Sequence, residues 1–332
     1  METNWNQVLG HVQQKAELRT MLREERLPHA LLFSGPEGVG KKMLAHVLAT
    51  TLLCGQGETA CGSCSSCRLM RLGDSHPDYY ELTPEKRGKG QAVIRIEQIR
   101  ELQREASRAP VMSGRRVLLI DDADRMNEAA ANSLLKTLEE PVGNVTFILV
   151  TSARSALLDT ILSRCMPLSF GMLSREHIAQ ILQARGTADT EALELADLAD
   201  GSAARALQLQ AEDGLQLRDE AMQFLRERQH MDMLRVWQLA AAWGEMDKDK
   251  LTQWSRYLNM LLRDLLVLRE DGASPLLLQQ DKRAELMELL PAYPAARLYR
   301  LLALVHAWQR RLQSNASPKL QAEGFLIRAR EV

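Results

Sequence analysis

Short apolar runs alternate with amphipathic segments through the first half of the chain. The runs cover residues 30–34, 117–120 and 145–150 and end in glycine, acidic or hydroxyl residues, which is the pattern of short buried strands. Between them, residues 95–108 and 129–140 carry apolar side chains at helical spacing, and each segment is followed by a proline, as expected at a helix end. Strands that alternate with helices predict an α/β fold with a doubly wound parallel sheet, whose ligands bind beyond the carboxyl ends of the strands.

The strand pattern stops after Phe170. The sequence from there to about residue 211 predicts a small helical unit, and the remainder predicts long amphipathic helices separated by glycine and proline. One helix carries an apolar stripe that is typical of a helical bundle. The stripe consists of Trp254, Leu258, Leu261, Leu265 and Leu268.

The length and amino-acid composition limit the number of domains and exclude some classes of protein. The 332 residues include 42 Lys and Arg against 43 Asp and Glu, and 45% are apolar. This length allows two or three domains with cores of their own. The net charge of −1 excludes a strongly basic protein that coats nucleic acid, although a local basic patch is compatible with it.

The first ten residues, METNWNQVLG, lack the charged start and apolar run of a signal peptide. No stretch of about 18 consecutive apolar residues occurs along the chain either. We therefore expect a cytoplasmic protein that does not contact a membrane.

A glycine-rich loop follows the first predicted strand and precedes a predicted helix. Gly35, Gly38, Gly40 and Lys41 fit the first seven positions of a P-loop, GxxxxGK, in which backbone N–H groups and the lysine bind phosphates. The eighth position should be Ser or Thr, whose hydroxyl ligates Mg²⁺, but here it is Lys42. A lysine cannot ligate a cation, so we expect ATP binding to be weak or absent.

Asp121 and Asp122 follow the second predicted strand, VLLI, in the form of a Walker B motif. Asp121 would hold magnesium through water, whereas working ATPases of this type have a glutamate at the next position to orient the attacking water. Asp122 is one methylene shorter. Two acidic residues that only cap a buried strand are the alternative, and both interpretations favour a degenerate site.

Four of the five cysteines lie close together in the sequence, at Cys54, Cys61, Cys64 and Cys67. Four thiolates satisfy a tetrahedral zinc ion with no open position, which indicates a structural site and not a catalytic one. A redox CxxC pair is the alternative, but it would need only two thiols.

Arg164 follows the third predicted strand in the segment ILSRC. An arginine there can simply pair with a neighbouring carboxylate. The functional alternative is an arginine finger that reaches a nucleotide on an adjacent subunit and neutralises transition-state charge.

Several of these segments together resemble one family. RLPHALLFSGPEGVGKK, the four cysteines, VLLIDDADRMNEAAANSLLKTLEEP and ILSRC are similar to the delta-prime subunits of bacterial DNA polymerase III clamp loaders, which are relatives of the tau/gamma subunits within the AAA+ family. The resemblance spans nearly the whole chain.

The resemblance implies three parts and a set of partners. Residues 1–170 would form a RecA-like AAA+ module with a zinc insert at about 54–67, residues 171–211 a helical lid, and residues 212–332 an α-helical collar. It also implies a five-subunit ring with tau/gamma and delta subunits that places the sliding clamp on primer-template DNA. Within it, the four cysteines would bind structural Zn²⁺ and Arg164 would act in trans.

Three residues of this chain differ from those of the family's motor subunits, and these differences indicate the function that we expect. Motor subunits have Thr or Ser, Glu and Arg where this chain has Lys42, Asp122 and Ala204. We therefore expect a subunit that does not hydrolyse ATP but completes the active site of its neighbour. An autonomous AAA+ ATPase of the tau/gamma type is the alternative. No carboxylate constellation for nucleotidyl transfer is present, so polymerase activity would belong to the holoenzyme.

Overall fold

The structure is a computed structural model that describes residues 4–73, 76–86, 92–211, 214–274, 276–312 and 317–332. It contains two compact units. The first comprises Met1–Ile181 with Gly201–Arg205, and the second comprises Leu182–Asp200 with Ala206–Val332. The expected boundary between lid and collar, at residue 212, lies outside the described residues, so the three-part division stays a prediction.

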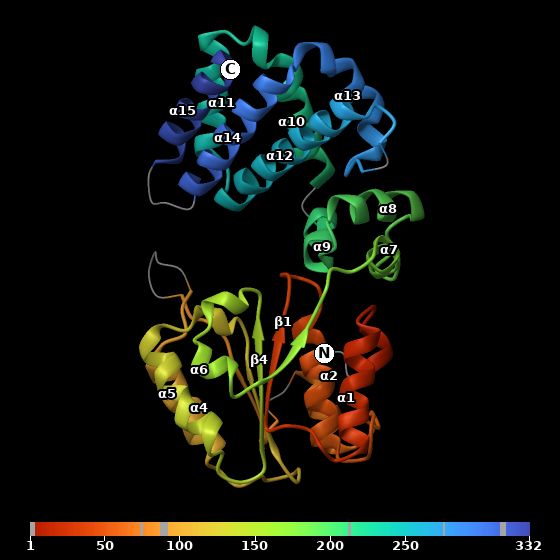
Figure 1. Cartoon of the computed structure of the whole chain (residues 1–332), viewed down its shortest axis with the longest axis vertical. Coiled ribbons are helices and arrows are strands. Elements are labelled where there is room, and N and C mark those ends of the chain that lie inside the picture. The colour runs from red at the N-terminus through yellow and green to blue at the C-terminus, as the bar shows by residue number, and fades with distance from the viewer. Residues whose placement is uncertain (1–3, 74–75, 87–91, 212–213, 275, 313–316) are drawn as a thin grey trace. The chain divides into compact units, whose positions relative to one another are not determined.

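A parallel sheet of five strands forms the centre of the first unit, in the order β2-β3-β4-β1-β5 (Figure 1). The strands are β1 (Ala30–Ser34), β2 (Tyr79–Leu82), β3 (Arg116–Ile120), β4 (Val145–Thr151) and β5 (Met166–Ser169). The helices that accompany them are α1 (Val12–Arg23), α2 (Lys41–Cys54), α3 (Ser65–Leu72), α4 (Ile96–Ala106), α5 (Glu128–Glu139), α6 (Asp159–Leu162) and most of α7 (Arg175–Gln183). Short 3-10 helices occur at Trp5–Gln7, Ala123–Arg125 and Arg154–Ala156.

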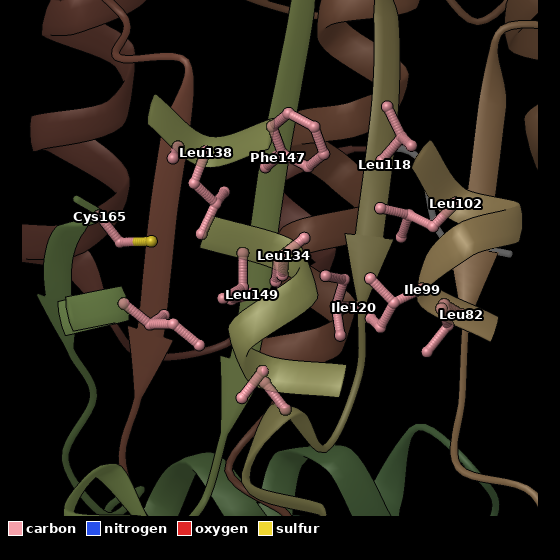
Figure 2. Close-up of a cluster of buried hydrophobic side chains, with 14 of the residues drawn as sticks. Leu82, Ile99, Leu102, Leu118, Ile120, Leu134, Leu138, Phe147, Leu149 and Cys165 are labelled. Carbon is pink, nitrogen blue, oxygen red and sulfur yellow. The ribbon is translucent and has the colours of Figure 1, made fainter. Parts of the chain in front are cut away.

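Helices cover both faces of this sheet, with α4 and α5 on one side and α1 and α2 on the other (Figure 1). Successive side chains of a strand point to opposite faces, so strands covered on both sides are buried at every position. This is why β3 and β4 contain continuous apolar runs, with Arg116, Thr146 and Thr151 buried beside them. Figure 2 shows the core on the α4/α5 side. It includes Leu82, Ile99, Leu102, Leu118, Ile120, Leu134, Leu138, Phe147 and Leu149.

The predicted α/β class is confirmed, but the sequence pattern predicted only three of the five strands. The missing two, β2 and β5, form the edges of the sheet. Pro167 within β5 lacks an N–H group, and an edge position tolerates this loss because no further strand needs that donor. Only Leu82 is buried in β2, so the strand gives no apolar run.

The second unit is helical, as predicted. Its helices are α8 (Asp189–Leu198), α10 (Gly214–Glu227), α11 (Met233–Glu245), α12 (Lys248–Glu270), α13 (Arg283–Leu289), α14 (Ala295–Leu312) and α15 (Pro318–Glu331), together with most of α9 (Ala203–Ala211). All five residues of the predicted stripe on α12 are buried. Trp254 of that stripe packs on Trp243, and Trp308 stacks on Phe325 with ring centroids 4.2 Å apart. Among the described helices, none has both the length and the apolar character needed to cross a bilayer.

Candidate functional site

The glycine-rich loop connects β1 to α2 as predicted. Gly38 and Gly40 have positive φ angles of 76° and 100°, which favour glycine because it lacks a Cβ atom. Helix α2 then begins at Lys41. The first-turn N–H groups of this helix are therefore at the carboxyl end of the sheet, where a P-loop binds phosphate.

The Lys41 side chain is turned onto its own loop. Its ammonium donates hydrogen bonds to the carbonyl oxygens of Gly35 (2.7 Å) and Pro36 (2.6 Å). The residue is only 6% exposed, and burial lowers the pKa of its ammonium. These two carbonyl groups occupy two of the three N–H donors of the ammonium, so a phosphate group that took more than the third donor would have to displace them.

A second segment of the same unit packs on the glycine-rich loop. The N–H group of Ala204 donates to the carbonyl oxygen of Gly38 (3.1 Å). A Cβ atom at Gly38 would lie 2.2 Å from the Ser202 hydroxyl and 2.7 Å from the Ala204 methyl group, so the contact requires glycine. Ala204, which the family resemblance places where motor subunits would carry an arginine, therefore lies against the loop, and its side chain is a methyl group.

Lys42 forms ion pairs with two carboxylate groups of the site. Its ammonium lies 2.7 Å from Glu81 Oε1 and 2.9 Å from Asp121 Oδ2. Burial alone would lower the pKa of Lys42, but the two carboxylates raise it above its ordinary value. A Mg²⁺ ion needs oxygen ligands and an octahedral shell, and a cationic side chain already neutralises the carboxylates here. The residues present do not fit this metal.

Asp122 lies beside this cluster in a left-handed backbone conformation, with φ 46°. Its Oδ2 atom is 3.4 Å from Arg125 Nε. Burial, followed by the charge of Asp121, raises the pKa of the Asp122 carboxyl group. The paired arginine and the short side chain both restrict Asp122 as a group that could orient water.

The four clustered cysteines meet at one point. Their sulfur atoms all lie within 4.8 Å of one another, and the Cys61–Cys67 and Cys54–Cys64 Sγ pairs are each separated by 3.9 Å. Zn–S bonds of about 2.3 Å in a tetrahedron place sulfur atoms about 3.8 Å apart. The geometry therefore fits a four-coordinate metal such as zinc.

Backbone N–H groups support these sulfur atoms. The N–H of Cys61 donates to Cys54 Sγ, that of Cys64 to Cys61 Sγ, and that of Cys67 to Cys64 Sγ, at 3.3–3.4 Å. The N–H groups of Ser63 and Cys64 lower the pKa of Cys61 to about 5. At Cys61 these bonds favour the thiolate form that metal binding requires. Burial instead raises the pKa of Cys54, and it raises that of Cys67 to about 12.

Arg164 lies at the other end of the sheet. It lies two residues before β5, which runs parallel to β1, so it is at the amino end of the strands, whereas the glycine-rich loop follows the carboxyl end. Its guanidinium pairs with Glu139 and donates to the carbonyl oxygen of Thr160 (2.8 Å). Arg164 therefore cannot serve the loop of its own chain, and the simple ion pair considered from the sequence is present.

The structure thus gathers the predicted loop residues, Asp121 and Asp122 at one edge, and it places the cysteines and Arg164 elsewhere. Glu81 was not predicted from the sequence as a site residue, and neither were His46 and Tyr79, which both contact Glu81. The position of Glu81 in the sequence was a usable signal. Glu81 is an acidic residue near the end of YYEL, just as Asp121 is an acidic residue that follows the neighbouring strand of the sheet. The run was too short and polar to be recognised as a strand.

Comparison with known proteins gave consistent results. A family model described as "DNA polymerase III, delta subunit" matches residues 10–174. The "DNA polymerase III subunit delta'" of Pseudomonas aeruginosa is 36% identical over 233 residues, which cover 68% of this chain and 69% of that protein. The protein of the same name from Escherichia coli is 36% identical over 200 residues, or 59% of each chain.

Similarity extends to a second kind of subunit. The "DNA polymerase III subunit tau/gamma" of Haemophilus influenzae is 36% identical over 217 residues, which cover 65% of this chain and 30% of that protein. The chain therefore matches less than a third of that longer relative, and less than two thirds of the E. coli protein.

Proposed function

Since this chain belongs to the family of DNA polymerase III delta-prime subunits, we propose that it is a clamp-loader subunit that does not itself hydrolyse ATP. Its partners would be the tau/gamma and delta subunits of a five-subunit ring. That ring would load the sliding clamp onto primer-template DNA in the cytoplasm. The DNA would be bound by the assembled complex and not by this subunit alone.

One observation supports the absence of hydrolysis most directly. The Lys42 ammonium lies between Glu81 and Asp121, where a P-loop ATPase needs a magnesium ion and a hydroxyl ligand. Without the metal, charge that develops on the transferred phosphoryl group is not neutralised. The methyl side chain of Ala204 and the short carboxylate of Asp122 also disfavour ATP hydrolysis.

The position of Arg164 supports a role in trans. The residue lies opposite to its own loop, and its side chain is 31% exposed, so a neighbouring subunit can reach it. In the ring, its guanidinium would exchange the Glu139 carboxylate for phosphate oxygens of a nucleotide bound by that neighbour. A planar guanidinium binds phosphate with two parallel hydrogen bonds, which suits this exchange.

The four cysteines would hold structural zinc. Four protein ligands leave no coordination position for water or substrate, so the metal would stabilise the insert between α2 and α3 and supply no chemistry. Cys54 ends α2 and Cys67 lies in α3, so the ion would join these two helices.

The arginine proposal is tested in the reconstituted clamp loader with Arg164→Ala. We expect assembly to be unchanged and clamp loading to fall by about tenfold or more, because an arginine finger contributes much of the phosphoryl-transfer rate. Glu139→Ala is the matched control, since it breaks the same ion pair but keeps the guanidinium, and loading should stay close to wild type. Unchanged loading with Arg164→Ala, or an equal loss in both variants, would overturn the proposal.

A further inference from the structure

The environment of Lys42 is built by two neighbouring strands. β2 and β3 are parallel neighbours, and the N–H group of Asp121 donates to the carbonyl oxygen of Leu82 (2.9 Å). The Glu81 and Asp121 carboxylates thus leave adjacent strand ends and meet at one ammonium group. Two carboxylates that share a site repel each other unless a cation lies between them.

Glu81 is fixed from its other side. Its Oε2 atom accepts a hydrogen bond from the Tyr79 hydroxyl (2.9 Å) and lies 3.2 Å from His46 Nε2. His46 is four residues after Lys42 on α2, so both side chains lie on the same face of this helix. Each Glu81 oxygen therefore has a partner, and α2 is attached to the sheet at two successive turns.

We propose that the Lys42 ammonium is a tethered substitute for a divalent cation. It carries the positive charge that Glu81 and Asp121 require, fastens α2 to the ends of β2 and β3, and closes this position to Mg²⁺ whether or not nucleotide is present. This property belongs to the isolated chain, so its test is separate from that of the clamp-loading proposal.

If the charge of Lys42 is what excludes the metal, removing that charge should leave an oxygen-lined site that binds a divalent ion. Thr at position 42 would add a hydroxyl ligand, as in a working P-loop. Arg at position 42 would keep the positive charge and exclude the ion.

Binding of Mn²⁺ to the isolated, zinc-loaded chain, followed by electron paramagnetic resonance, tests the proposal. We expect Lys42→Thr to bind one Mn²⁺ per chain at least about tenfold more tightly than wild type, and Lys42→Arg to behave as wild type. Arg125→Ala is a further control, because it removes the exposed partner of Asp122 and leaves Lys42 in place, so it should gain no Mn²⁺ affinity.

Two results would overturn the inference. One is a wild-type chain that binds Mn²⁺ as tightly as Lys42→Thr, and the other is a Lys42→Thr chain that gains no affinity. Lys42→Gln, which keeps most of the side-chain length and offers a carbonyl oxygen, serves as the second variant if Thr at this position prevents folding. The thermal midpoint gives an independent readout, since Mg²⁺ should raise it in the neutral variants and not in wild type.

Discussion

Glu81 and His46 face each other across the junction of β2 and α2, with His46 Nε2 3.2 Å from Glu81 Oε2. Burial alone would raise the pKa of Glu81, but His46 and Lys42 lower it to about 2, from an ordinary value of 4.5. A carboxyl group with a lowered pKa stabilises the fold above its unfolded pKa, and this stabilisation is lost as the pH falls through the folded pKa.

This linkage predicts an acid-sensitive first unit. Between about pH 4.5 and pH 2, Glu81 should lose a contribution of at most about 3 kcal/mol to the free energy of unfolding. Glu81→Gln should be less stable than wild type at neutral pH, and the difference should shrink as the pH falls. Urea unfolding of both proteins across this range measures it, and parallel stability curves would contradict the assignment.

Asp78 organises the loop before β3. Its buried carboxylate accepts the N–H groups of Val111 (2.6 Å), Met112 (2.8 Å) and Ser113 (2.7 Å). We expect Asp78→Ala to lower the free energy of unfolding by about 2–4 kcal/mol, because three donors lose a charged acceptor. Asp78→Asn keeps one acceptor oxygen and should lose less. Denaturant unfolding measures both losses, and equal stability of Asp78→Ala and wild type would show that water replaces the carboxylate.

Metal content tests the cysteine site. Freshly prepared, reduced protein should contain about one zinc per chain, and Cys64→Ser should lose most of it, because structural zinc needs all four ligands. Cys165→Ala is the control, since Cys165 is buried in the core cluster of the sheet and should leave the zinc content unchanged. Elemental analysis gives the answer, and a metal-free wild-type protein would refute the site.

The fold was largely predictable because each of its three central strands contains four consecutive apolar residues. β1, β3 and β4 are covered on both faces, and burial of this kind leaves a clear run in the sequence. β2 and β5 were missed because an edge strand needs fewer apolar residues and tolerates proline. The alternation of strands and helices was still enough to indicate a parallel sheet.

The candidate site was predictable where the chemistry is local in the sequence. The loop glycines, Lys41 and the four cysteines follow fixed spacings, and the structure brings each group together. The contact of Lys42 with Glu81 depends on the pairing of β2 with β3, which no spacing reveals. The ion pair of Arg164 with Glu139 likewise joins residues 25 positions apart, so the sequence could only leave both interpretations open.

ATP turnover by the isolated, zinc-loaded chain, with Mg²⁺ and primed DNA present, shows whether this subunit hydrolyses ATP by itself. Lys41→Ala is the matched control, because it removes the phosphate-binding ammonium and reports any contaminating ATPase. We expect wild type and Lys41→Ala to show the same background rate, even if wild type binds nucleotide weakly. Steady, DNA-stimulated hydrolysis by wild type that Lys41→Ala abolishes would rule out a non-hydrolysing subunit and identify the chain as an ATPase in its own right.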